Sequence, residues 1–428
     1  MMISSKRAFA LALAFGGFAA TPALAQYQST PQPQPIPQAT PSAEAAPAAE
    51  GRKYDLSSGA RKAIVVLQKA VNAKDTASIP AALAAANAAA KTNDDKYVIT
   101  QLQLKAAVDQ KNDGAITAAL EAMLATGAAT PAQRLPLETN LGKQYYNAKQ
   151  YDRAATMFEG VLKLDPNNAD SLAMLAETRK AQGRVPDAVA LLQKGIAARV
   201  AAGQKPSEEW YKRAVALAYE AKLPSVIPLS REWVAAYPSP TNWRDTLRIY
   251  QSGSGLDDDT LIDLMRLQRA SGALAGESDY YRYANGVLIK GYPGEAKAVL
   301  EEGFAAKSID RSKAIFRDTL AAANAKVASD RASLPGLEKT ALAAAAAKPA
   351  MVTGDAYLGY GDYAKAAALY RAALTKSGVD PSLANLRLGI ALARSGDKGG
   401  ATTAFNAVTG PRADIAKYWV LWLSTRAG

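Results

Sequence analysis

The sequence predicts an all-α protein, a solenoid of antiparallel helix pairs, and three observations support this prediction. Apolar residues recur with helical spacing from residue 58 almost to the C-terminus. No alternating apolar and polar run of useful length, as a strand would need, interrupts them. Small or apolar residues also recur about every 34 residues at one helical position, which is typical of stacked helical repeats.

The N-terminus has the pattern of a secretory signal peptide. Lys6 and Arg7 precede an apolar run over 8–20, and a triplet of small residues then ends at Ala25. A short membrane anchor is the weaker alternative, because the run is shorter than the ~20 residues that a spanning helix needs. We expect residues 1–25 to be removed by cleavage near Ala25, and the mature protein to be periplasmic or secreted.

Residues 26–56 are rich in proline, glutamine and alanine, with prolines at alternate positions near the start. Almost no bulky apolar residue occurs there, so the segment cannot build a core. It is predicted to be a disordered linker, with a Pro-rich ligand segment as the alternative.

Composition limits the chemistry that the chain can perform. Among its 428 residues there is no histidine and no cysteine, which excludes histidine-dependent triads, thiol catalysis, zinc sites and disulfides. The formal net charge is +12, and this excess suggests an acidic peptide or protein, an anionic envelope polymer or a lipid surface as partner. The alternative is that the charge serves solubility alone. Nucleic acid suits the charge but not an exported protein, and no stretch of the mature chain is apolar enough to span a membrane.

The clearest repeat unit extends from residue 141 to residue 166. It carries a Leu-Gly-x2-Tyr pattern ending at Tyr145, an Ala-x3-Phe pattern from Ala154 to Phe158, and a terminal proline, Pro166. This unit resembles the tetratricopeptide repeat. Gly142 and Ala154 let two antiparallel helices approach closely, while the two aromatic rings fill the space between successive pairs.

The resemblance implies a right-handed superhelix whose parts we can place along the chain. It is strong over about 131–202 and 347–410, and a turn lengthened by the sequence SGSGLDDD interrupts it at 252–259. The expected parts are degenerate N-terminal helical repeats at 57–130, repeats at 131–309, a degenerate helical pair at 310–346, C-terminal repeats at 347–410 and a capping helix at 411–428.

Two further predictions depend on this repeat. Projecting Gly142 forward places small or apolar residues at equivalent positions, namely Ala176, Ala214, Leu247, Ala284, Gly354 and Gly389. The last helix carries Trp419 and Trp422, which we expect to shield the end of the last repeat. Its alternative role is to lie on a membrane surface.

Motifs that carry chemistry are weak in this chain. Asp257–Asp259 could suggest a cation site, but acidic residues before a helix are more simply its cap. Ser395 and Lys398 match a Ser-x-x-Lys element whose companion motifs are absent. We therefore predict no catalytic, cofactor-binding or metal-binding residues. The alternative is an envelope hydrolase of the lytic-transglycosylase type, which would need an appended catalytic domain.

In tetratricopeptide proteins the first helix of each pair lines the concave face, and the resemblance carries this role over to exposed positions of this chain. The predicted groove residues are Lys143, Tyr146, Tyr211, Arg244, Arg248, Tyr281 and Asn285. Tyrosines interleaved with arginines suit an extended acidic peptide or a glycan bearing carboxylates. Ordinary packing and a solvated face are the alternatives. The sequence thus predicts an exported scaffold or adaptor without enzymatic activity, whose oligomeric state stays open.

Overall fold

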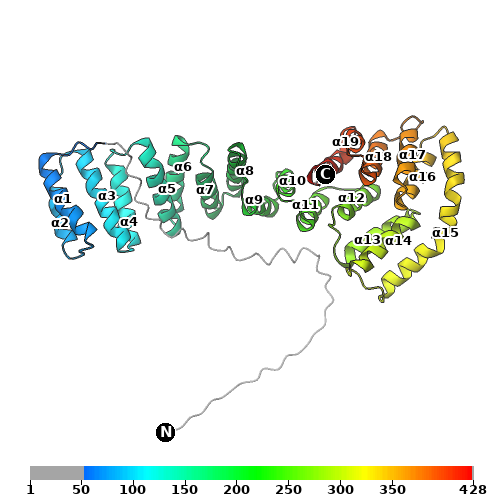
Figure 1. The fold of residues 1–428 in the computed structure, drawn as a ribbon, viewed down its shortest axis with the longest axis horizontal. Coiled ribbons are helices and arrows are strands. Elements are labelled where there is room, and N and C mark those ends of the chain that lie inside the picture. Colours follow the sequence, from blue (N-terminus) through cyan, green and yellow to red (C-terminus); the bar gives the residue numbers. More distant parts are fainter. Residues whose placement is uncertain (1–52, 427–428) are drawn as a thin grey trace, which may run out of the picture. The chain divides into compact units, whose positions relative to one another are not determined.

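The computed structural model describes residues 53–426, and this part of the chain is built from α-helices joined by short connections (Figure 1). The all-α prediction is confirmed. The helices divide between two compact units, of which the first ends at Gln144 and the second begins at Tyr145. The predicted signal peptide, and the predicted linker up to Arg52, lie outside the described residues.

The helices of the first unit are α1 (Ser58–Asn72), α2 (Ile79–Ala89), α3 (Asn93–Asp109), α4 (Asp113–Ala125) and most of α5 (Pro131–Asn147). The second unit continues with α6 (Tyr151–Leu164), α7 (Ala169–Ala181), α8 (Val185–Ala201), α9 (Glu208–Glu220), α10 (Val226–Ala236), α11 (Pro240–Gly253) and α12 (Asp258–Ala270). It ends with α13 (Gly276–Ile289), α14 (Pro293–Ala305), α15 (Ala314–Ala343), α16 (Lys348–Gly359), α17 (Tyr363–Ala373), α18 (Pro381–Ser395), α19 (Lys398–Asn406), the short η2 (Gly410–Arg412) and α20 (Ala413–Thr425).

Most helix pairs are closed by a tight turn that contains one residue with positive φ. Glycine occupies this place at Gly183, Gly291, Gly361 and Gly396. Lysine occupies it in the turns α1–α2, α3–α4, α5–α6 and α9–α10, at Lys74, Lys111, Lys149 and Lys222. The left-handed conformation costs a residue with a side chain roughly 1–2 kcal/mol. Glycine would therefore stabilise these four turns more than lysine does.

Small residues set the distance between helices where the sequence placed the repeat. A Cβ added at Gly354 on α16 would lie 2.8 Å from the ring of Tyr370 on α17. One added at Gly389 on α18 would lie 2.5 Å from the ring of Phe405 on α19. Each aromatic ring therefore packs directly on a helix backbone, as the repeat pattern requires.

One prediction about a single element is wrong. The segment 310–346 is not a helix pair, because it contains the one long helix α15. A pair would need a turn, and no residue between Ala314 and Ala343 has the positive φ that closes most other pairs.

The C-terminal helix α20 returns to helices that come much earlier in the chain. It packs on α18 and α19, and it also contacts α10 and α12. Trp419 stacks on Phe405 with ring centroids 5.7 Å apart, and Tyr418 meets Tyr250 of α11 edge to face at 5.4 Å. The structure buries Trp419 and Trp422, which a helix lying on a membrane surface would leave exposed.

A buried cluster of charges joins α12, α14, α16 and α18 inside the second unit. Arg266 of α12 donates to both carboxylate oxygens of Glu295, at 2.9 and 2.7 Å, and to Asp263 at 2.8 Å. Arg387 of α18 donates to Asp355 of α16. Tyr283, Tyr292 and Tyr370 complete the cluster by donating to its carboxylates. Because the groups are buried and paired, they tie four helices together.

Candidate interaction face

The first helices of the pairs α5–α6 to α11–α12 expose a row of polar side chains within the second unit. We call this row the first-helix face and define it by Tyr146, Glu177, Lys212, Arg213, Asp245 and Arg248. Their helices α5, α7, α9 and α11 each contribute at least one side chain. All six are exposed or half-buried, so a partner can reach them.

Three of these side chains are coupled across α5, α7 and α9. Arg213 donates from Nε and Nη2 to the two carboxylate oxygens of Glu177, at 2.9 and 2.7 Å. These hydrogen bonds hold the pKa of Arg213 above its ordinary value. Burial raises the pKa of Tyr146, and the Glu177 carboxylate raises it further. The tyrosine hydroxyl therefore stays protonated and can act as a hydrogen-bond donor.

Asp245 on α11 is half-buried, and it makes no hydrogen bond with another described residue. Burial raises the pKa of its carboxyl group. The guanidinium groups of Arg244 and Arg248 partly offset this effect, and Lys212 of α9 acts in the same direction. Asp245 is thus a carboxyl group that a bound donor could satisfy.

The two predicted groove arginines, Arg244 and Arg248, differ in their surroundings. Arg244 is half-buried and donates from Nε to the backbone carbonyl of Ala273 at 3.1 Å, so it helps to hold the turn after α12. Arg248 has a side chain that is 47% exposed and pairs with Asp279 of α13 at 3.3 Å. An exposed pair of this kind is weak, which leaves Arg248 free to exchange its partner.

Tyr211 is not part of the face, and its prediction is wrong. It is 4% exposed, and its ring packs edge to face on Tyr237 at 6.0 Å. The projection placed Ala214 in register, but Tyr211 and Val215 are buried at the spacing of Trp243 and Leu247 in α11. A register error of one residue turns a side chain by about 100° around the helix. The exposed position is therefore Lys212.

The other three predicted groove residues, Tyr281, Asn285 and Lys143, lie outside the first-helix face. Tyr281 and Asn285 of α13 are half-buried, and Tyr281 packs against the apolar core formed by α12 to α15. Lys143 is half-buried and lies in the first unit. Sequence reasoning missed four residues of the first-helix face, namely Glu177, Lys212, Arg213 and Asp245. The opposite charges of Glu177 and Arg213, on first helices of adjacent pairs, were the signal that could have revealed two of them.

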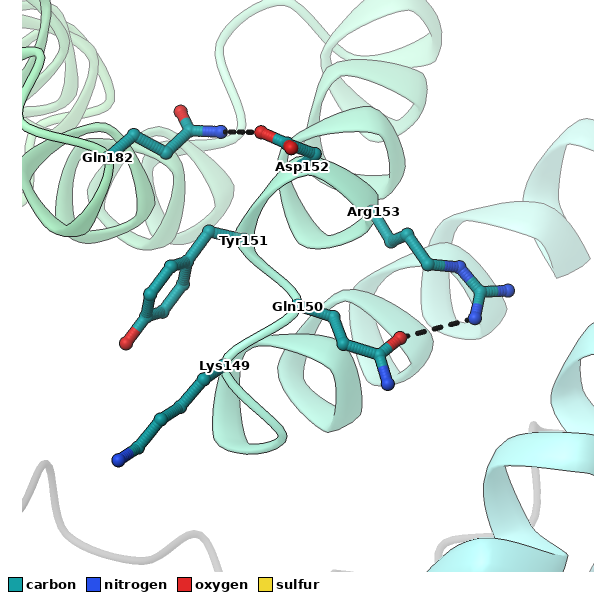
Figure 2. A pocket seen from close by; sticks show the side chains of 6 residues that line it. All are labelled: Lys149, Gln150, Tyr151, Asp152, Arg153 and Gln182. Atoms are coloured by element: carbon teal, nitrogen blue, oxygen red, sulfur yellow. Dashed lines mark hydrogen bonds between the residues drawn. The ribbon is translucent and has the colours of Figure 1, made fainter.

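The two hollows that stand out on the surface are lined by none of the seven predicted residues. One of them has a volume of about 460 Å³ and lies at the α5–α6 turn (Figure 2). Its walls are Lys149, Gln150, Tyr151, Asp152, Arg153 and Gln182. Gln182 donates to Asp152 at 2.6 Å and Arg153 to Gln150 at 3.2 Å, so most of its polar groups already have partners.

The acidic motif at Asp257–Asp259 and the Ser-x-x-Lys motif at Ser395 have structural roles in this fold. Asp257 is the N-cap of α12 and accepts a hydrogen bond from the backbone N–H of Thr260 at 2.7 Å. Ser395 donates to the carbonyl of Leu392 at 2.9 Å. Within residues 53–426, no three acidic side chains gather in a way that could hold a metal ion. In the same range, no helix is long and apolar enough to cross a membrane.

Family models of the tetratricopeptide repeat match two segments of the second unit, residues 145–202 and residues 351–415. The first segment contains α6, α7 and α8, and it includes the Ala-x3-Phe part of the repeat pattern, from Ala154 to Phe158. The second contains α17, α18 and α19. No curated protein matches the sequence.

Solved structures with detectable similarity include a tetratricopeptide repeat protein from Parabacteroides merdae, at 12% identity and a TM-score of 0.31. That match covers 78% of this chain and 100% of the other. Another is the TPR2AB-domain:pHSP90 complex of yeast Sti1, at 11% identity and a TM-score of 0.24. It covers 68% of this chain and 98% of the other.

Proposed function

We propose that this chain, a tetratricopeptide repeat protein, is a non-catalytic scaffold or adaptor that holds an extended segment of a protein or peptide on its first-helix face. The repeat itself supports a role in protein interaction. The predicted acidic character of the partner is part of this proposal. Lys212 and Arg248 are the most exposed cations of the face, with 44% and 47% of their side chains accessible.

The observation that carries this proposal is the state of Asp245. Its carboxyl group is half-buried, its pKa is raised, and it has no hydrogen-bond partner among the described residues. The partial loss of water around this group therefore costs free energy in the unbound protein. A peptide N–H placed against it would remove that penalty. Lys212 lies on the neighbouring first helix, α9, and Arg248 lies one turn after Asp245 on α11. The same peptide could therefore present carboxylates to both cations.

The proposed place of action is the bacterial cell envelope, where the protein would assist assembly, secretion or polysaccharide export. Support comes from Lys6, Arg7 and the apolar run that ends before the small residues at 23–25. N-terminal sequencing of the protein from an envelope fraction should give Gln26 as the first residue. An uncleaved N-terminus in the cytoplasm would contradict export.

The experiment that tests the binding proposal compares two variants with equal loss of charge. Lys212→Gln with Arg248→Gln removes the exposed cations of the face. Lys163→Gln with Lys194→Gln removes two exposed lysines of the second helices α6 and α8, which make no ion pair with a described residue. The immobilised protein captures partners from an envelope extract, and each captured protein is then measured against both variants.

We expect the first variant to weaken binding of a specific partner by tenfold or more, about 1.4 kcal/mol, at unchanged melting temperature. The second variant should bind as the wild type does. Equal binding by the wild type and both variants would refute the proposed face.

A further inference from the structure

The helix α1 has one face that the described part of the chain leaves exposed. The helix packs on α2 and α3 at the end of the first unit (Figure 1), and its buried residues lie on the side of these contacts. Along the opposite side lie Lys62, Val65 and Lys69, spaced by three and four residues, with Arg61 and Val66 flanking them. We call these five exposed residues the α1 outer face.

The two valines give this face a small apolar patch. Val65 is 59% exposed and Val66 is 60% exposed. Single exposed apolar residues are common and need no partner. These two, however, are the only neighbours in sequence among the large exposed apolar side chains of residues 53–426. Because they adjoin each other, one bound apolar side chain could remove both from water, which is favourable.

The charge on the α1 outer face has a single sign. The helix contains no aspartate or glutamate, and Asp75 in the turn after it is the only acidic residue in the sequence from 56 to 92. Arg61, Lys62 and Lys69 make no ion pair with any described residue. A complementary charge would therefore come from a bound molecule.

The chain that precedes α1 leads away from this face. Ser57 donates its backbone N–H and its hydroxyl to the carboxylate of Asp95 on α3, at 2.9 and 2.8 Å. Tyr54 accepts a hydrogen bond from Gln133 of α5 at 3.0 Å. Residues 54–57 thus run from α1 past α3 to α5. The described chain begins beside α5 and not beside the α1 outer face.

Two other occupants also suit the face poorly. A second copy of the chain would place three cations against three cations, because the face has no carboxylate to pair with them. An anionic lipid surface would attract the cations, but the face offers only two valines, and no aromatic or leucine side chain, for insertion. Acidic residues beside an apolar stripe would satisfy both the cations and the valines.

The stacking of helix pairs indicates that this occupant is a helix. In a solenoid, each inner pair packs between the pair before it and the pair after it. The helix α3, for example, contacts α1 and α2 of the preceding pair as well as its own partner α4. Among the described residues, α1 has no preceding pair. After the last pair, by contrast, α20 packs on α18 and α19 and buries Trp419.

We propose that the α1 outer face binds an amphipathic helix of a partner protein. The apolar stripe of that helix covers Val65 and Val66, and the acidic residues beside the stripe pair with Arg61, Lys62 and Lys69. This surface belongs to the first unit and is separate from the first-helix face, so the inference does not rest on the proposed function. An adaptor with both surfaces holds two partners at once.

The test places a photoreactive amino acid at position 65 of the full chain in living cells. Irradiation should give a discrete adduct. Mass spectrometry of the digested adduct should identify a peptide of another protein that has acidic residues beside an apolar stripe of helical spacing. The matched control has the same amino acid at position 200, where Val200 is 57% exposed on α8, and should not give this adduct.

The identified peptide is then synthesised and titrated against the mature protein. We expect Lys62→Glu with Lys69→Glu to weaken binding at least tenfold at unchanged melting temperature, because both side chains are exposed. Lys163→Glu with Lys194→Glu changes the net charge equally, at exposed positions of α6 and α8, and should bind as the wild type does. Lys62→Arg with Lys69→Arg keeps the charge and should also retain binding.

An adduct with residues 26–52 of the same chain, with a second copy or with lipid would overturn the inference, as would the absence of any adduct. Equal binding of the peptide by the charge-reversal variant and its control would also overturn it, because net charge alone would then explain the affinity. The variant Lys212→Gln with Arg248→Gln should keep the adduct from position 65. Failure of the first-helix face is thereby distinguished from failure of the α1 outer face.

Discussion

At the scale of single residues, buried carboxylates differ in how the fold satisfies them. Asp95, in the first unit, is fully buried and accepts hydrogen bonds from the backbone N–H groups of Lys91 and Thr92. Ser57 adds its backbone N–H and its hydroxyl, at 2.9 and 2.8 Å. Burial alone would raise the pKa of Asp95, but these donors lower it to about 2. The residue thereby fixes the segment before α1 to the start of α3.

Because the pKa of Asp95 is lower in the folded state than its unfolded value of about 3.9, its ionised form stabilises the fold above that pH. This stabilisation should disappear as the pH falls toward 2. We expect Asp95→Asn to reduce the free energy of unfolding by about 2 kcal/mol at neutral pH, and by much less at about pH 2. Denaturant titrations at both pH values test this, with the exposed Asp318→Asn as control. A loss that is independent of pH would contradict it.

Asp263 and Asp355 belong to one buried cluster but play different parts in it. Asp355 accepts hydrogen bonds from Tyr292, Tyr370 and Arg387. Asp263 has one oxygen bonded to Arg266, while its other oxygen is buried without a partner among the described residues. Burial raises the pKa of Asp263, and Arg387 and Arg266 only partly oppose it, with Asp355 adding repulsion. The cluster therefore makes ionisation of Asp263 less favourable than it is for a carboxyl group in water.

A raised pKa means that ionisation of Asp263 weakens the fold as the pH rises above its unfolded pKa. Asparagine resembles the protonated form, so Asp263→Asn should leave the free energy of unfolding at neutral pH unchanged or increase it. Asp355→Asn should reduce it by about 3 kcal/mol, because it leaves buried donors without an ionised acceptor. Urea denaturation of both variants makes the comparison. If Asp263→Asn proves as destabilising as Asp355→Asn, Asp263 is ionised in the fold.

At the scale of helices, local pattern predicts well and long-range contact does not. The positions of Gly354 and Gly389 followed from the repeat, because a small residue must face the aromatic ring of the next helix. The single helix α15 was missed, because helical periodicity and length do not show whether a segment forms one helix or two. Pro335 lies inside α15 without ending it. Proline costs one helical hydrogen bond, but without a residue of positive φ the chain cannot turn back tightly.

The same distinction explains the errors at the candidate site. The sequence identified the correct helices, because first helices were recognised from the repeat pattern. It chose Tyr211 in place of Lys212, because the connection between α8 and α9 shifts the register by one residue. The pairing of Arg244 with the carbonyl of Ala273 depends on the turn after α12 and has no local signal.

At the scale of the second unit, the chain closes on itself. Arg231 of α10 pairs with Asp414 of α20 at 3.2 Å across 183 positions of sequence. Arg412 likewise reaches Asp257, at the lengthened turn that interrupts the repeat. No repeat pattern specifies such contacts, because a repeat describes only neighbours. The residues of the first-helix face, on which the functional proposal rests, are exposed or half-buried in this unit.

Photo-crosslinking from single positions tests the central claim, that the first-helix face binds the partner, most directly. A photoreactive amino acid at position 212 or 248 is compared with one at position 163 or 194, on the second helices α6 and α8. In living cells, irradiation should give the same discrete partner adduct from the first two positions and none from the other two. Adducts that form only from positions 163 and 194, or equally from all four, would contradict the claim.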